Sequence, residues 1–342
     1  MAAAQRRLRQ LLAAVRPRAA WASGRGSTHA SSPPPRQQGE SANPTPRAPA
    51  RRRRVVVNHD ILAQLFSPQV TEAGVLSPDE LWQHLVGDLL DVPDTMIDSI
   101  LFCWSEGNEA PYPSKVLPTL LDHPIFEHVP QDLDLVRLCC DRARARGVEA
   151  IFSLRISGGD HDRTNGGYQP IPKLAAKWDH PERLIDWSPD PADARPAPDA
   201  PKVLEARYHP AAFWDFASSG TRAVRLAALR EVAESYDFDG IDLDFARNSP
   251  VLQPGQQWSS RQHLTSFVRS VRSMLDEVGA RRGRPFTLSA RVPETIVGCH
   301  FDGIDIERWV SEGLVDFLVL VRLNLGCPTG PPALTDSLRR LH

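Results

Sequence analysis

The chain has 342 residues, of which 41% are hydrophobic, and its formal net charge is −2, a composition typical of a water-soluble globular protein. No run of about 18 apolar residues occurs, so the sequence predicts no membrane-spanning helix. The charge is unevenly distributed, because residues 1–54 hold 12 Arg, no Lys and one acid, Glu40.

Residues 1–54 form a basic segment rich in Arg, Ala, Pro and Ser and without apolar periodicity, and we therefore expect a disordered tail. The pattern is compatible with an organelle transit peptide, with a twin-arginine export signal at Arg6 and Arg7, or with a tail or misplaced start codon that has no targeting role. No signal peptide is convincing, so the location stays open between the cytoplasm and export. The run 51–54 lacks interleaved aromatic residues, and we expect no nucleic acid partner.

From residue 55 onward, strand-like and helix-like segments alternate, which predicts a parallel sheet. A closed (β/α)8 barrel needs eight strands, whereas the sequence shows six. We expect an α/β fold of the TIM-barrel type over residues 55–342, with about six of its eight βα units present and the chain ending about two units early, unless the sheet stays open. Strands are expected at 55–58, 97–104, 148–156, 236–247, 286–292 and 314–322, and helices at 78–90, 131–146, 221–235, 260–278, 304–312 and 333–342.

A long insertion at about residues 157–218 follows the third strand and contains Trp178, Trp187 and Trp214. Loops of this length are usually functional or disordered. The tryptophans are expected either to stack on sugar rings over the barrel mouth or to form a small core of the loop's own.

The segment 236–247 is the most informative part of the sequence. Ile241 and Leu243 share one strand parity, whereas Asp242 and Asp244 share the other. In a parallel barrel the apolar face packs on the helices, the opposite face points to the barrel axis, and the carboxyl ends of the strands carry the chemistry. We therefore expect two carboxylates at the mouth. The alternative is that they only bind loop amides or pair with arginines.

The same parity argument brings arginines to this mouth. Arg155 on the third strand and Arg291 on the fifth face the axis, Arg322 ends the sixth strand, and Arg247 lies just beyond the fourth. An arginine beside a carboxylate favours its ionised form, which a glycosidic nucleophile or oxocarbenium stabiliser requires. Spare arginines would bind an anionic substrate.

A glycosidase also needs a proton donor. Glu294, just past the fifth strand, is the candidate, ahead of Glu106 and Glu109, which follow the second strand. Asn58, at the end of the first strand, is added to the expected substrate-binding residues.

Metal and cofactor chemistry has weak support. His59 and Asp60 could join Asp242 and Asp244 as ligands, which leaves a metal-dependent hydrolase as one alternative. The sequence contains no HExxH, CxxC, GxGxxG or GxxxxGK[ST] pattern, so we predict no cofactor and no metal ligand.

Several segments resemble the glycosyl-hydrolase-like TIM-barrel proteins of bacteria, the family-10-like glycosidases. The resemblance spans about residues 54–325, is strongest in 236–247, and includes 113–116, 289–293, 303–309 and 312–316. It implies a TIM-barrel glycoside hydrolase that acts on polysaccharide. The fourth strand is also similar to the DGxDxDxE strand of family 18 chitinases, in which the final Glu is the acid, but this chain has Ala246 there.

The function predicted from the sequence is hydrolysis of O-glycosidic bonds in a polysaccharide or oligosaccharide, with Asp244 as the key carboxylate and Asp242 in support. Arg155 and Arg291 would orient the site. A carbohydrate-binding or degenerate barrel without catalysis is the main alternative, because no proton donor stands out. The sugar, its charge, the anomeric outcome and the oligomeric state stay open.

Overall fold

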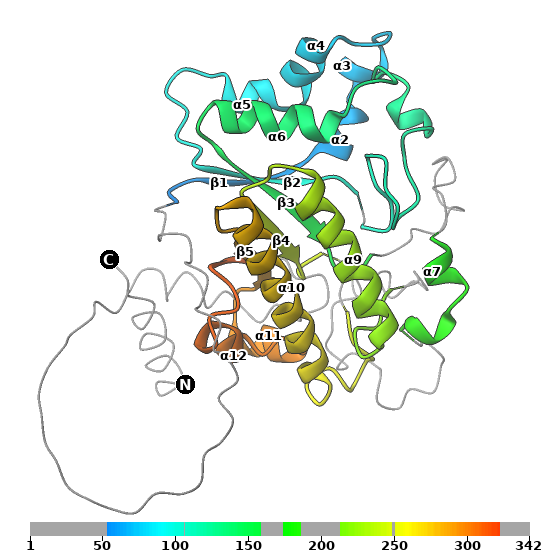
Figure 1. Ribbon diagram of the computed structural model, residues 1–342, viewed down its shortest axis with the longest axis vertical. Helices are drawn as coiled ribbons and strands as arrows, with labels where there is room; N and C mark the ends of the chain where they lie inside the picture. Colours follow the sequence, from blue (N-terminus) through cyan, green and yellow to red (C-terminus); the bar gives the residue numbers. More distant parts are fainter. Residues whose placement is uncertain (1–52, 106, 159–173, 186–212, 248–249, 322–342) are drawn as a thin grey trace, which may run out of the picture. The chain divides into compact units, whose positions relative to one another are not determined.

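Six parallel strands form the centre of the structure. The computed structural model describes residues 53–105, 107–158, 174–185, 213–247 and 250–321. The strands pair in the order of the sequence, each parallel to the next (Figure 1). This is the strand order of a TIM barrel, so the expected α/β fold of the TIM-barrel type is confirmed, with six strands in the described residues. The strands are β1 (Val56–Asp60), β2 (Ser99–Cys103), β3 (Glu149–Arg155), β4 (Gly240–Asp244), β5 (Thr287–Pro293) and β6 (Phe317–Val321).

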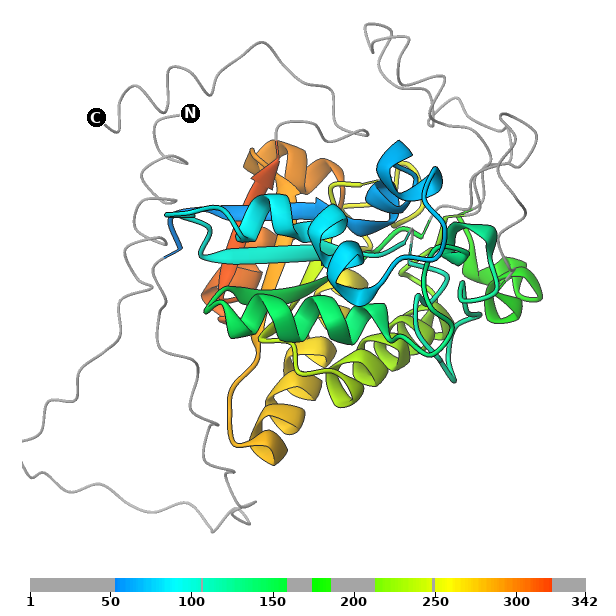
Figure 2. The ribbon, with the colours of Figure 1, turned by 90° about the horizontal axis from the view of Figure 1, so that it is seen from above.

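The long helices α6, α9 and α10 cover one side of this sheet (Figure 1). Figure 2 shows the sheet from above, curled so that β6 is strongly rotated relative to β1. Within the described part of the chain, no helix combines the length and the apolar character that crossing a membrane requires. The helices are α2 (Ile61–Leu65), α3 (Pro68–Thr71), α4 (Pro78–Trp82), α5 (Asp88–Leu90), α6 (Leu135–Ala145), α7 (Ala175–Trp178), α9 (Ser219–Ser235), α10 (Arg261–Arg282), α11 (Ile296–Phe301) and α12 (Ile306–Ser311).

Local sequence signals predicted where helices and strands begin better than how long they are. Ser77 and Glu80 form the expected capping box at the start of α4. The helix expected over 78–90 is nevertheless divided, because a π-helical turn separates α4 from α5. Similarly, the segment 236–247 is a strand only over Gly240–Asp244, and the short helix α11 was not predicted.

The two faces of β3, β4 and β5 follow the expected parity. Ile241 and Leu243 of β4 are fully buried, as are Leu288 and Ala290 of β5, and all four belong to the hydrophobic core. The helices cover this face. The opposite face carries the polar residues and forms the interior of the curled sheet.

On β6 the parity is the reverse of that expected, because Phe317 and Val319 lie beside the interior residues Ser289 and Arg291, whereas Asp316 pairs with Arg272 of α10.

A buried ion pair closes the amino-terminal end of this interior. Glu149 of β3 accepts hydrogen bonds from Arg53 Nε (2.6 Å) and Nη2 (2.5 Å), and from the hydroxyls of Ser99 and Thr287. The Arg53 guanidinium also lies 4.4 Å from the centre of the Phe317 ring. Arg53 therefore links β3 to β6, and this part of the basic run belongs to the folded unit rather than to a solvated tail.

We expect Arg53→Met to lower the free energy of unfolding by about 3 kcal/mol, because it leaves the Glu149 carboxylate buried without its charged partner. Arg54→Met is the matched control. The Arg54 side chain is 59% exposed, so its pair with Asp98 is screened by solvent and should contribute little to stability. Urea denaturation of both variants measures the difference. Equal losses of unfolding free energy in the two variants would contradict the assignment of Arg53 to the buried ion pair at the amino-terminal end of the interior.

Candidate active site

Asp242 and Asp244 face the interior of the curled sheet, as strand parity predicted. Gly240 allows β4 to approach β5 closely, because a Cβ at this position would lie 2.6 Å from the carbonyl oxygen of Thr287. Each aspartate is flanked by one residue of β3 and one of β5: Asp242 by Ser153 and Ser289, and Asp244 by Arg155 and Arg291.

Asp242 is fully buried and hydrogen-bonded on both carboxyl oxygens. Ser289 Oγ donates to Oδ1 at 2.7 Å and Ser153 Oγ donates to Oδ2 at 2.8 Å. Burial raises the pKa of Asp242 to about 6, and the charge of Asp244 acts in the same direction, while the two serine hydroxyls oppose it. A pKa of about 6 would let Asp242 gain or lose its proton in mildly acidic solution.

Asp244 is 1% exposed and accepts hydrogen bonds on both oxygens. The backbone N–H groups of Ala246 and Arg247 donate to Oδ1 at 3.0 and 3.1 Å, and Arg291 Nη1 donates to Oδ2 at 2.9 Å. Burial raises the pKa of Asp244, while the positive charges of Arg291 and Arg155 act against this shift. The three donors favour the carboxylate form against the effect of burial, and the two backbone donors also shape the turn after β4.

A row of alternating charges crosses the carboxyl end of the sheet. Arg155 is buried and forms an ion pair with Asp60 of β1, while Asp244 pairs with Arg291 of β5. His59 lies on the other face of β1, where Nε2 is 2.5 Å from the carbonyl oxygen of Leu85. His59 therefore does not join the carboxylates.

The described residues contain no group of three or more His, Cys, Asp or Glu side chains arranged to hold a metal ion. The interior row of Asp60, Asp242 and Asp244 is instead interleaved with arginines and serines. These neighbours supply positive charge and hydroxyl donors where a metal site would need further oxygen or nitrogen ligands.

Arg225 of α9 joins two loops at the mouth. It is fully buried, and its guanidinium donates to the carbonyl oxygens of Gly107, Arg155 and Ile156. Gly107 has φ +92°, and a Cβ there would lie 2.5 Å from the carbonyl oxygen of Arg155. Arg225 was missed in the sequence, although a charged residue four positions before Leu229, on the buried face of a helix, is a recognisable signal.

Trp214 is a buried structural residue of the loop that precedes α9, and it offers no exposed surface to a sugar. It is fully buried, and its Nε1 donates to Asn108 Oδ1 at 2.8 Å. Asn108 Nδ2 donates in turn to the carbonyl oxygen of Gly158 at 2.6 Å, which also accepts from Lys177 Nζ at 2.5 Å. The indole cannot stack on a ligand in this position, so its assignment as a sugar contact is corrected.

The remaining candidates have mixed placements. Glu294 is half-buried just past β5, and its backbone N–H donates to Val321 O at 3.1 Å. Asn58 is exposed on the interior parity of β1, and Arg247 is exposed after β4. The side chains of Trp178, Trp187 and Arg322 lie outside the described residues.

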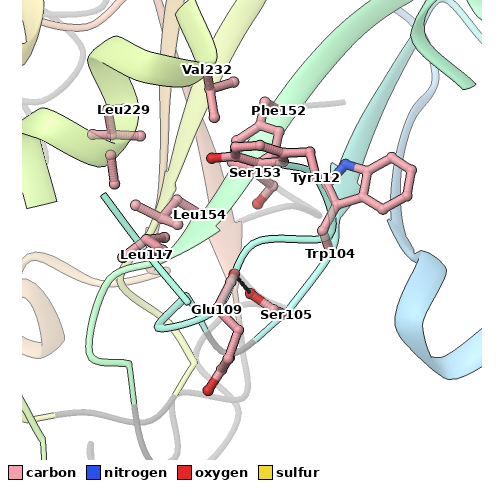
Figure 3. A pocket seen from close by; sticks show the side chains of 11 residues that line it. Trp104, Ser105, Glu109, Tyr112, Leu117, Phe152, Ser153, Leu154, Leu229 and Val232 are labelled. Carbon is pink, nitrogen blue, oxygen red and sulfur yellow. Dashed lines mark hydrogen bonds between the residues drawn. The ribbon is translucent and has the colours of Figure 1, made fainter. Parts of the chain in front are cut away.

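A small cavity lies behind the mouth, between β3, α9 and the loop after β2 (Figure 3). Its volume of about 10 Å³ is close to the minimum that holds one water molecule and is far too small for a sugar ring. Trp104 Nε1 is buried and has no hydrogen-bond partner among the described residues. The Glu109 carboxylate points away from the apolar side chains of the cavity (Figure 3). This cavity is therefore not the substrate site.

No family model and no curated protein matches this sequence. Among solved structures, the chain is similar to alpha-L-fucosidase isoenzyme 2 from Paenibacillus thiaminolyticus, with 17% identity, a TM-score of 0.42, and coverage of 69% of this chain and 32% of that chain. It is also similar to the PgaB (BpsB) glycoside hydrolase domain from Bordetella bronchiseptica, with 14% identity, a TM-score of 0.46, and coverage of 78% of this chain and 73% of that chain. A third similar structure is a family GH18 chitinase from Chromobacterium violaceum, with 13% identity, a TM-score of 0.43, and coverage of 79% of this chain and 36% of that chain.

The matched region thus spans about a third of the fucosidase and of the chitinase. The TM-scores are below 0.5, so the assignment of the site depends on the geometry of this chain itself.

The raised pKa of Asp242 predicts a pH-dependent stability. Because the pKa in the folded protein, about 6, exceeds the usual value of 3.8, the unfolded chain releases this proton first as the pH rises. The free energy of unfolding of the wild type should therefore fall by about 3 kcal/mol relative to Asp242→Asn between about pH 4 and pH 6. Urea denaturation across this range measures the difference.

Ser289→Ala removes one hydrogen-bond donor that lowers the pKa of Asp242. The fall in the free energy of unfolding should therefore extend to higher pH in this variant. Parallel pH profiles for the wild type and Asp242→Asn would contradict the prediction.

Proposed function

We propose that this chain hydrolyses O-glycosidic bonds of a polysaccharide or oligosaccharide. The supporting observation is the position of Asp244, which ends β4 at the carboxyl edge of the sheet and is held between the charges of Arg155 and Arg291. This edge carries the active site in TIM-barrel enzymes. An anion here would stabilise the positive charge of an oxocarbenium-like transition state.

Each residue has a distinct role in this proposal. Asp244 is the key carboxylate, and its negative charge would act on the positive charge that develops in the substrate. Asp242 supports it as a buried neighbour whose pKa is raised to about 6. Glu294 is the proton donor, because it follows the adjacent strand β5 and is partly accessible.

The charge balance of the mouth favours a neutral saccharide over an anionic one. The positive charge of Arg155 is matched by Asp60, and that of Arg291 by Asp244. An anionic sugar would have to displace a carboxylate from one of these pairs.

A second candidate is carbohydrate binding without catalysis. The observation that favours it is the near-complete burial of Asp244, together with Ala246, which is 3% exposed where a chitinase-like strand carries its acid. Binding of an oligosaccharide without release of product would distinguish this function from hydrolysis.

We expect Asp244→Asn to reduce turnover at least about 100-fold, because a neutral amide cannot stabilise the developing positive charge. Release of reducing ends from a panel of oligosaccharides measures activity, and circular dichroism verifies the fold. Asp79→Asn is the control, since it makes the same chemical change at an 89% exposed side chain on α4. Full activity in Asp244→Asn would overturn the proposal.

A further inference from the structure

A group of exposed apolar side chains lies at the same end of the sheet as Asp244. We define the rim patch as Trp258, Val297, His300 and Phe301. α11 follows the carboxyl end of β5 almost directly, and Trp258 lies just before α10 begins, on the connection from β4. Figure 1 shows α11 next to the start of α10.

The rim patch is continuous across these two connections. Val297, His300 and Phe301 are three and four positions apart, so they share one face of α11. The His300 ring packs against the Trp258 indole, with ring centres 3.9 Å apart. The exposed fractions are 39% for Trp258, 78% for Val297 and 42% for Phe301. Single exposed apolar residues are common, but a contiguous group of large ones marks a binding surface more often.

The indole of Trp258 is held firmly in its exposed position. The Arg261 guanidinium lies 4.3 Å from the ring centre, and Arg261 Nη1 donates to the carbonyl oxygen of Trp258 at 2.8 Å. Asp305 lies 3.4 Å from Arg261 Nε and fixes it from the other connection. An aromatic ring that is already ordered loses little conformational entropy when a ligand binds.

A close backbone contact holds the two connections together. Gly303, with φ +74°, lies where a Cβ would be 2.5 Å from the carbonyl oxygen of Gln257. The Nε2 atom of His300 is buried and has no hydrogen-bond partner among the described residues, so its imidazole serves as a packing surface for the indole. The rim patch is therefore built into the fold.

We propose that the rim patch is a stacking subsite for a sugar residue of a bound oligosaccharide, at a distance from the bond that is cleaved. This inference builds on the proposed function and specifies the substrate as an oligosaccharide or polysaccharide chain. The apolar faces of sugar rings pack on aromatic side chains as other apolar surfaces do. Gln256 and Gln262, which are close to Trp258 in the sequence, are exposed and carry amide groups of the kind that bind sugar hydroxyls.

The size of the rim patch favours a sugar over a protein partner. A stable protein interface buries roughly 1,200–2,000 Å² in total and engages about 20–30 residues on each side. Three exposed apolar side chains on two connections provide far less area, which suits a single sugar ring that packs on the exposed parts of Trp258, Val297 and Phe301.

The test compares short and long ligands of the full chain, carried out in the Asp244→Asn background so that hydrolysis does not disturb the measurement. Titration calorimetry gives the affinity for the disaccharide and the hexasaccharide of cellulose, chitin and amylose. We expect Trp258→Ala to weaken binding of the preferred hexasaccharide about tenfold, the effect of losing one stacking contact of about 1.4 kcal/mol. Binding of the disaccharide should not change.

Two further variants secure the interpretation. Met96→Ala removes another exposed apolar side chain, 63% exposed and located before β2 at the opposite end of the sheet, and should change neither affinity. Trp258→Phe retains an aromatic face and should restore most of the hexasaccharide affinity, which a general loss of folding would not allow.

The outcomes separate the two proposals. Unchanged hexasaccharide binding in Trp258→Ala, with turnover lost in Asp244→Asn, would overturn the subsite and leave the hydrolase proposal standing. Weakened binding in Trp258→Ala, with no turnover in the wild type, would support the subsite and overturn the hydrolase. If none of the probes binds, the subsite proposal is wrong.

Discussion

The burial of two carboxylates on one face of β4 is the constraint on which the interior of this protein depends. Asp242 and Asp244 are 0% and 1% exposed, and burying such groups is costly unless hydrogen bonds or opposite charges compensate. The register supplies this compensation from both neighbouring strands, with two serines at Asp242 and two arginines at Asp244. Arg155 in turn requires a partner, and Asp60 of β1 provides it. The two aspartates of β4 thus require polar or charged partners on β3 and β5 and, through Arg155, on β1.

The same chemistry fixes the register of the sheet. A shift of β4 by one residue would move both aspartates into the apolar layer that packs on the helices, and would turn Ile241 and Leu243 toward the charged interior. At the amino-terminal end, Glu149 imposes an equivalent condition through Arg53. Charged pairs at both ends of the interior therefore specify the pairing of the strands, although a barrel interior filled only by apolar layers would be easier to desolvate.

Strand parity predicted which residues of β3, β4 and β5 share the mouth, because side-chain direction alternates along a strand. It placed Asp244 and Arg291 on one face, where the structure shows them as an ion pair. It failed on β6, where the choice of the apolar face was ambiguous because both faces carry apolar residues. It could not predict contacts made from distant segments. Arg53 belongs to a run that is basic and low in complexity, Arg225 lies on a helix, and Trp214 lies in a loop rich in proline. Their partners are backbone carbonyls, a buried carboxylate and an amide that only the tertiary structure brings near.

The two sides of the mouth differ in a way that bears on how a saccharide would approach. On the β2–β3 side, Arg225 and Trp214 lock the connections through backbone carbonyls and Asn108, and both side chains are fully buried. This side of the mouth, the locked wall, is tightly packed and has little accessible surface for a ligand. On the β4–β5 side, the connections carry the exposed rim patch and Glu294. If the function is as proposed, the locked wall keeps Arg155 and thereby Asp244 in place, and the chain of sugars extends across β4 and β5, where apolar surface is available without any rearrangement of the fold.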